Sequence, residues 1–252
     1  MKHFEVLKTS ANRRIAFVRN YSESQNKKTP GFVFLGGFRS NMLGTKASFL
    51  ENLCISSGYD FIKFDYSGHG DSSETFESGC ISDWKNDACE VLDKLTQGPQ
   101  VLVGSSMGGW ISLLLGKIRP ERVAAFVGIA AAPDFTEISM WESFDAKLRE
   151  EINATGRISI PSSYSEEPLI ITKKLIEDGR RNLIMSNPLD IPFPVRLLQG
   201  MQDKEVHYSE AIKLAENITH DDVELTFVKG ADHQFSSAAC LQILKRSLME
   251  FV

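Results

Sequence analysis

The chain has 252 residues, of which 42% are hydrophobic and 24% are charged, and its formal net charge at pH 7 is -5. These proportions are typical of a globular protein and argue against disorder, and the acidic balance argues against a nucleic-acid partner. The longest apolar run, Val123 to Pro133, is far shorter than the roughly 20 residues of a membrane-spanning helix. We therefore expect a single domain with no membrane span.

The N-terminal residues and the cysteines predict the cellular compartment of the protein. The first twenty residues interrupt their apolar positions with charges and show neither an export nor a transit signal. The four cysteines are scattered, without the spacing of a metal site or a disulfide framework. We expect reduced thiols, no metal and a cytoplasmic location.

Short apolar runs alternate with stretches of helical period, which is the pattern of a mostly parallel, doubly wound α/β sheet. The predicted strands are Phe4 to Lys8, Arg14 to Arg19, Phe32 to Leu35, Phe61 to Asp65, Gln100 to Gly104, Val123 to Ile129, Pro194 to Gln199 and Val223 to Val228. The predicted helices are Thr45 to Ser57, Ile81 to Leu95, Met107 to Lys117, Ser209 to Glu216 and Ala238 to Phe251. The first two strands flank a polar turn and predict an antiparallel hairpin at the sheet edge.

The alternation breaks after the sixth strand, at residues 134–192. Two amphipathic segments, Trp141 to Asn153 and Glu166 to Ser186, are joined there by the proline- and serine-rich link ISIPSSYSEEP. We interpret this stretch as a small helical lid, with a pair of packing helices as the alternative. Its apolar side chains either line an acyl pocket or form plain core; they are Met140, Trp141, Phe144, Leu148, Leu169, Ile170, Leu175 and Ile176.

A nucleophile motif follows the fifth predicted strand. Gly104 to Gly108 reads GSSMG, which matches GxSxG between a strand and a helix, with Ser106 at its centre. The glycines two residues on either side have a steric reason, because the turn there is too tight for side chains. Ser106 is the predicted nucleophile.

A serine nucleophile needs a histidine base, and in this architecture the base follows both the serine and the acid in the chain. Of the five histidines, His3 and His69 precede Ser106, and His207 and His220 lie just after or just before a strand. His233 alone follows the last strand and is the predicted base.

The acid is expected on the loop after the preceding strand. Asp203 lies there, with Gly200 allowing the chain to turn. Asp134, which also follows a strand, is a rival, and Asp232 is a weaker one because adjacent residues tend to point apart. We take Asp203 as the predicted acid.

Two backbone N–H groups should bind the oxyanion of an acyl-transfer intermediate. Met107, the residue after the nucleophile, supplies one at a helix N-terminus. The pair Gly36 and Gly37 leads to Phe38, which is predicted to supply the other; a simple glycine turn is the alternative. The loop FDYSGHGDS reads as structural, with Asp65 and His69 shaping it.

At this point the chain resembles the α/β-hydrolases, and more narrowly the mitochondrial family of palmitoyl-protein thioesterase and mycophenolic acid acyl-glucuronide esterase. The stretches that carry the resemblance are GFRSNMLGTKA, FDYSGHGDS, GPQVLVGSSMGGW, RPERVAAFVGIAAAPDF, IPSSYSEEP, RLLQGMQDKEV and GADHQF. It implies Ser106 as nucleophile, Asp203 as acid and His233 as base, and an ester or acyl thioester substrate. The chain departs from the family where His207 replaces its usual proline, and where a transit segment would stand.

The predicted function is therefore a serine hydrolase that cleaves carboxylic esters or thioesters through an acyl-enzyme, with no cofactor. Its substrate is a small molecule or an acylated protein. A non-catalytic binding protein on the same scaffold is the alternative, since fold alone does not define activity. Carbon–carbon bond hydrolysis, or acyl transfer to an acceptor other than water, is a third reading.

Overall fold

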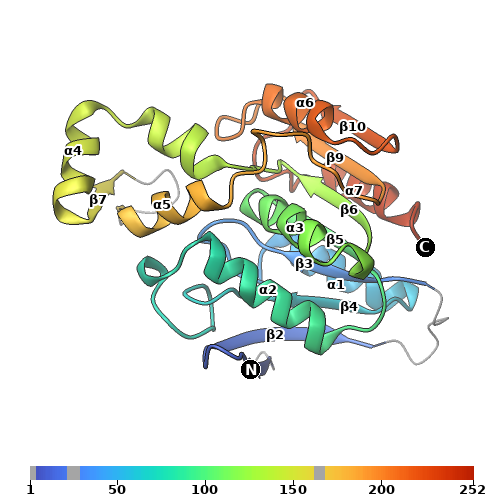
Figure 1. Ribbon diagram of the computed structural model, residues 1–252. Helices are drawn as coiled ribbons and strands as arrows, with labels where there is room; N and C mark the ends of the chain where they lie inside the picture. The colour runs from blue at the N-terminus through green and yellow to red at the C-terminus, as the bar shows by residue number, and fades with distance from the viewer. Residues whose placement is uncertain (1–3, 22–28, 162–167) are drawn as a thin grey trace.

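An eight-stranded sheet forms the centre of the fold (Figure 1). The structure is a computed structural model that describes residues 4–21, 29–161 and 168–252. The strand order is β1-β2-β4-β3-β5-β6-β9-β10. The strands are β1 (Glu5–Lys8), β2 (Arg14–Asn20), β3 (Gly31–Leu35), β4 (Phe61–Phe64), β5 (Gln100–Ser105), β6 (Val123–Ile129), β9 (Val195–Gly200) and β10 (Val223–Val228).

Most neighbouring strands run in the same direction. β1 pairs with β2, and β2 with β4, in antiparallel fashion, and the remaining pairs of this sheet are parallel. The eight predicted strands and the edge hairpin are therefore confirmed, as is the mostly parallel, doubly wound α/β sheet.

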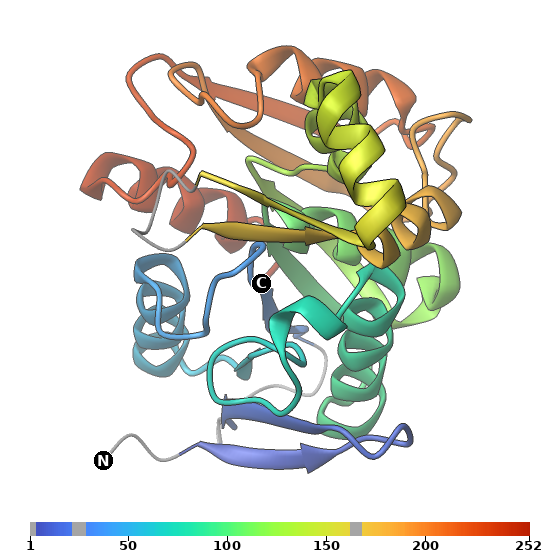
Figure 2. The same cartoon turned by 90° about the vertical axis from the view of Figure 1, so that its left-hand side faces the viewer.

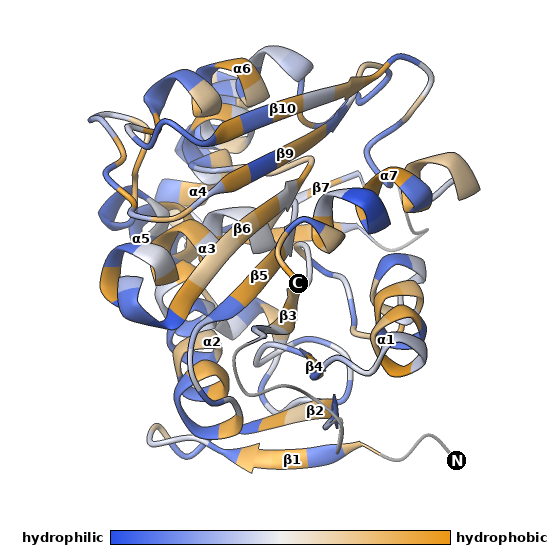
Figure 3. Cartoon of the chain, turned by 90° about the vertical axis from the view of Figure 1, so that its right-hand side faces the viewer, coloured by the Kyte–Doolittle hydropathy of each residue, from blue (hydrophilic) through white to orange (hydrophobic). Residues whose placement is uncertain are grey.

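Helices cover both faces of the sheet, because successive side chains of a buried strand point to opposite sides. In β3, Phe32 and Phe34 join the apolar cluster on one face, whereas Val33 and Leu35 join the cluster on the other. Figure 3 shows α1 and α7 on one side of the sheet and α2, α3 and α6 on the other. These helices are α1 (Thr45–Ser57), α2 (Ile81–Leu95), α3 (Met107–Ile118), α6 (Tyr208–Asn217) and α7 (Ala238–Met249), and two short 3-10 turns are Phe76–Ser78 and Pro120–Arg122.

Residues 134–192, which we call the insert, leave the sheet after β6. Figures 1 and 2 show the insert beside the sheet, at the end toward which the β6 arrow points. Its elements are a π-helix (Thr136–Met140), a 3-10 turn (Trp141–Ser143), α4 (Ala146–Thr155), β7 (Arg157–Ile160), β8 (Leu169–Thr172) and α5 (Lys173–Arg181). Part of the predicted link, residues 162–167, lies outside the described residues.

The sequence pattern predicts a purely helical insert, and this prediction is wrong. β7 and β8 form their own antiparallel sheet, in which Ile158 pairs with Ile171. Because a strand has a side-chain period of two, Ile171 is fully buried, while the predicted Ile170 is only half-buried. Phe144, Leu175 and Ile176 are buried in the core, as the alternative reading of the apolar positions expected.

The register of the central strands brings their carboxyl ends together. Leu35 of β3 lies opposite Gly104 of β5, and Ser105 lies opposite Ile129 of β6. The segments that follow β3 and β5 therefore leave the sheet side by side, and this edge carries the predicted site residues.

Candidate active site

Ser106 occupies a sharp turn between β5 and α3. Its backbone has φ 54° and ψ -118°, a left-handed conformation that is strained for a residue with a side chain. A side chain at Gly104 would collide with the backbone of Gly108, and one at Gly108 would collide with the carbonyl of Leu35. The sequence motif is thus explained by close backbone approach on both sides of the serine.

His233 lies between Ser106 and Asp203. Its Nε2 is 3.1 Å from Ser106 Oγ, and its Nδ1 is 2.8 Å from Asp203 Oδ2. The imidazole is 17% exposed and the Asp203 side chain is fully buried. The structure therefore brings the predicted nucleophile, base and acid into one chain of hydrogen-bond contacts.

The carboxylate of Asp203 has a partner at each oxygen. Oδ1 accepts the backbone N–H groups of Glu205 and Val206, and Oδ2 accepts the side-chain amide of Gln199 at 3.0 Å beside His233. Burial works to raise the pKa of Asp203, but these hydrogen bonds and the proximity of His233 hold it below its ordinary value. Asp203 is thus kept as a carboxylate with a fixed orientation.

Hydrogen bonds between the acid and base loops hold these two side chains together. The N–H of Gln202 donates to the carbonyl of Ala231 at 2.9 Å. Gly200 allows this approach, because a Cβ there would collide with the Ala231 carbonyl. The turn expected at Gly200 is present, since the N–H of Asp203 donates to the Gly200 carbonyl at 3.4 Å, although Gly200 itself has no left-handed φ.

The loop after β3 passes directly beside the serine. A Cβ built on Gly37 would lie 3.4 Å from Ser106 Cβ. The Phe38 ring packs edge-on against Phe76 and Phe135, with centroids 4.8 and 5.4 Å away. No described residue accepts the N–H of Phe38, and Met107 begins α3, whose first N–H groups have no acceptor within the helix.

The other histidines and the rival acids have different partners. His207 caps α6, and His220 accepts the N–H of Asp222; His3 lies outside the described residues. The carboxylate of Asp134 accepts the backbone N–H groups of residues 184 and 185, and that of Asp232 accepts one from residue 235. Neither rival acid has a described bond to His233.

Two charged residues near His233 escaped the sequence analysis. Glu205 Oε2 is 3.6 Å from His233 Nε2, on a side chain that is 41% exposed. Lys46 of α1 donates from Nζ to the carbonyl of Gln234, and burial lowers its pKa to about 8. Both contacts join residues that are distant in the chain, so no local sequence pattern predicts them.

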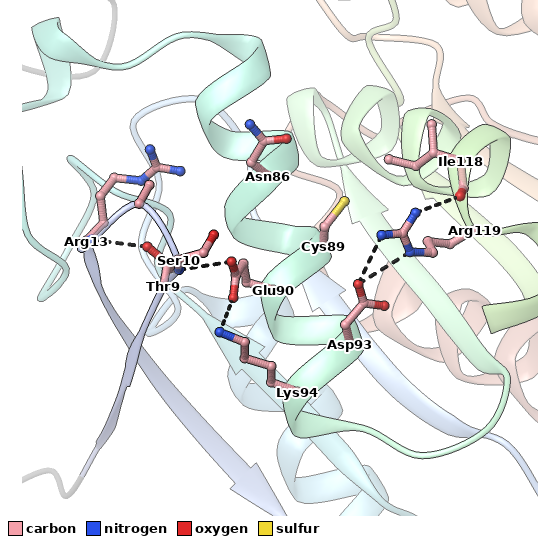
Figure 4. Close-up of a pocket in the computed structure, with 11 residues that line it drawn as sticks. Thr9, Ser10, Arg13, Asn86, Cys89, Glu90, Asp93, Lys94, Ile118 and Arg119 are labelled. Atoms are coloured by element: carbon pink, nitrogen blue, oxygen red, sulfur yellow. Dashed lines mark hydrogen bonds and ion pairs between the residues drawn. The ribbon is translucent and has the colours of Figure 1, made fainter.

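A depression of about 370 Å³ between the turn after β1 and helices α2 and α3 holds none of the predicted site residues (Figure 4). Its charged side chains are paired, Lys94 with Glu90 and Arg119 with Asp93. Within the described residues, no group of three potential ligands is placed to hold a metal, and no helix is long and apolar enough to cross a membrane.

The chain belongs to the α/β-hydrolase family, since residues 32–167 match the family model for the alpha/beta hydrolase fold. The Bos taurus protein named palmitoyl-protein thioesterase ABHD10, mitochondrial, is 35% identical over 226 residues, which cover 89% of this chain and 74% of the relative. A solved structure of alpha/beta hydrolase domain-containing protein 10 from mouse has a TM-score of 0.89 and 32% identity over 99% of this chain and 98% of its own. A crystal structure from Agrobacterium vitis S4, named only as a hydrolase, has a TM-score of 0.93 and 38% identity over the whole of both chains.

The expected cytoplasmic location is wrong by this comparison. The relatives from Bos taurus, Rattus norvegicus, Pongo abelii, Homo sapiens and Mus musculus are all named as mitochondrial. The physical reason is that a compartment is set by an address segment that receptors read, whereas composition and cysteine spacing describe the folded domain.

Proposed function

We propose that this hydrolase cleaves carboxylic esters or acyl thioesters through a covalent acyl-enzyme on Ser106. The observation that carries the proposal is the unbroken contact from Ser106 Oγ through His233 to the buried Asp203 carboxylate. A serine hydroxyl is a weak nucleophile, and a base oriented by a carboxylate activates it.

In the acylation step, His233 Nε2 accepts the proton of Ser106 as Oγ bonds to the acyl carbon. The carbonyl oxygen becomes an oxyanion, which the N–H groups of Phe38 and Met107 stabilise. The imidazolium then returns the proton to the departing oxygen or sulfur as its bond to the acyl carbon breaks. Asp203 holds the proton of His233 on Nδ1 and stabilises the imidazolium.

Deacylation repeats these steps with water. His233 accepts a proton from the water as its oxygen attacks the acyl carbon, and the same N–H groups stabilise the second oxyanion. The bond to Ser106 Oγ then breaks, Oγ regains a proton from His233, and the carboxylic acid leaves. The cycle consumes one water and needs no cofactor.

The name of the relatives favours an acyl thioester substrate, with a palmitoylated protein as the specific candidate. The resemblance in sequence adds an acyl glucuronide as a second candidate. The insert serves as the lid over this site. Phe135 at its start packs against both Phe38 and Trp110. Phe38 lies in the loop after β3, residues 36–44, which we call the oxyanion loop. Apolar insert side chains near this contact would then meet the acyl chain.

The test is hydrolysis of p-nitrophenyl esters of increasing chain length, palmitoyl-CoA and an acyl glucuronide, by the wild type and Ser106→Ala. We expect wild-type turnover and a loss of at least about 10³-fold in the variant. A fluorophosphonate probe should label the wild type alone. A folded wild type that is inert on every substrate and unlabelled would overturn the proposal and favour a binding protein; product analysis separates transfer to other acceptors.

A further inference from the structure

The loop after β4, residues 65–72, is bonded to the proposed oxyanion loop. We propose that His69 is a positioning residue that fixes the peptide beside Phe38, so that the Phe38 N–H points at the developing oxyanion. This inference rests on the proposed function, and it gives a role in the reaction to a histidine that the sequence analysis treated as part of a structural loop.

Both ring nitrogens of His69 are engaged. Nε2 lies 3.2 Å from the N–H of Arg39, and Nδ1 lies 3.2 Å from the carbonyl of Ser67. A carbonyl only accepts and a backbone N–H only donates, so the proton is on Nδ1 and Nε2 is the acceptor. The two contacts together define one neutral tautomer.

The surroundings of His69 keep the ring neutral and in place. The side chain is 4% exposed, and Phe76 and Trp84 pack edge-on against it with ring centroids 5.1 and 5.2 Å away. Burial lowers the pKa of His69 to about 4. The acceptor at Nε2 therefore persists at every pH where a serine hydrolase works.

The position of Ser67 is itself fixed by buried partners. Asp87, which is fully buried, accepts its hydroxyl at 2.6 Å and its N–H at 2.9 Å, and the indole N–H of Trp84 donates to its carbonyl at 3.0 Å. Asp87 in turn binds Arg13 at 2.7 Å. Residues of α2 and the edge hairpin thus fix Ser67, and Ser67 fixes the orientation of His69 beside the oxyanion loop.

The oxyanion loop needs such a tether because its backbone is strained. Arg39 has φ 57°, in the left-handed region, and the N–H of Ser40 closes a turn onto the carbonyl of Gly37. Asp65 provides a second tether by accepting the N–H of Met42 at 2.6 Å. Without the bond to His69, the Phe38–Arg39 peptide can rotate toward a relaxed geometry, and the adjacent Phe38 N–H moves with it.

The experiment compares His69→Leu, which removes the acceptor, with His69→Gln, which offers a carbonyl oxygen near the position of Nε2. His220→Leu is the matched control, since His220 also accepts a backbone N–H, at 3.1 Å from Asp222, on an exposed turn. kcat and KM are measured on a p-nitrophenyl ester from pH 5 to 9, beside Ser106→Ala.

We expect His69→Leu to lower kcat about 10- to 100-fold, less than the 10²- to 10³-fold typical of deleting an oxyanion donor. KM should stay within about twofold, the pH profile should keep its shape, and His69→Gln should recover most of kcat. A kcat for His69→Leu within twofold of wild type, or a loss that appears in KM alone, overturns the inference. An inert wild type instead contradicts the proposed function.

A second measurement does not depend on the variants folding. Nitrogen-15 NMR of the wild-type histidines should show His69 neutral, with its proton on Nδ1, between pH 5 and 8. A ring protonated on Nε2, or one that titrates near pH 6 to 7, would overturn the inference directly.

Discussion

The two regions that adjoin Ser106 are held in place by different forces. The loops after β9 and β10 are fixed by hydrogen bonds to particular atoms, and the Asp203 carboxylate alone has four donors around it. The outer part of the insert, residues 144–160 and 168–172, packs through apolar side chains, of which Phe144, Ile152 and Ile171 are buried. The hydrogen bonds of the loops set the direction in which individual side-chain atoms point, whereas the packing of the insert sets only its shape.

The two kinds of contact predict which mutations should affect chemistry and which should affect stability. Hydrogen bonds are directional and lose their effect when one atom changes, whereas packing is non-directional and tolerates substitutions that keep volume. We therefore expect changes in the loops to act on kcat with little loss of stability, and changes in the insert to do the reverse.

The largest expected effect is that of Asp203→Asn. The substitution preserves size but offers an amide where His233 needs an acceptor, which favours the wrong imidazole tautomer, so kcat should fall about 10⁴-fold. The free energy of unfolding, measured in urea, should change much less than the activation free energy of the reaction. A variant with kcat within tenfold of wild type would show that the loop does not orient the base.

Ile171→Ala should give the opposite result. It removes a fully buried side chain of β8, and the free energy of unfolding should fall by about 2 to 4 kcal/mol. Its neighbour Ile170, half-buried and outside the apolar cluster, is the matched control, with an expected loss below about 1 kcal/mol. If Ile171→Ala instead lowers kcat on a short-chain ester more than tenfold at unchanged stability, the contrast between the regions fails.

Lys46 beside the base loop should make the stability of the fold depend on pH. Its pKa of about 8 lies below the ordinary lysine value, so between pH 8 and 10 the unfolded chain holds a proton that the folded chain has lost. Stability from this group therefore rises with pH across that range, by up to about 3 kcal/mol from the size of the shift. Urea unfolding at pH 7.5 and 10 should show this rise as the difference between wild type and Lys46→Met, because the buried thiols of Cys54, Cys80 and Cys89, whose pKa values are raised by burial, lower stability over the same range in both proteins. The exposed Lys229→Met is the control. Equal pH dependence in all three proteins would exclude a buried charge at Lys46.

The smallest effect is expected for Glu205→Gln. The carboxylate stands 3.6 Å from His233 Nε2, on the side from which a leaving group takes its proton. Removing its charge should raise kcat/KM for an ester with an anionic leaving group about threefold relative to one with a neutral leaving group, since exposed charges interact weakly. At high salt the substitution should change kcat/KM for the two esters by the same factor, so the ratio of the two effects should approach one. A ratio that does not change at low salt would mean that Glu205 turns away from the bound substrate.

Most of the fold was predictable because buried parallel strands read as continuous apolar runs, as in Val101 to Val103. The candidate triad was predictable for a different reason. The order of serine, acid and histidine follows from which strand ends meet at one edge, so chain position alone separates His233 from the other histidines.

What could not be predicted depends on contacts between distant segments. The β7–β8 pair was missed because its strands are short and pair only with each other. Gln199 sits inside an apolar strand, and nothing local says that its amide reaches Asp203. Likewise, His69 gave no sign that its second nitrogen would bind Arg39, thirty residues earlier in the chain.

The contact between Ser106 and His233 spans 127 positions of the chain, and this separation has a consequence for biosynthesis. The growing polypeptide carries Ser106 and the loop after β3 well before His233 emerges. At translation rates of about 5 to 20 residues per second, the interval is on the order of ten seconds. In the proposed mechanism Ser106 then lacks its base, so we expect the nascent chain to be inert toward acyl compounds until its last strand and the loop beyond it have been synthesised.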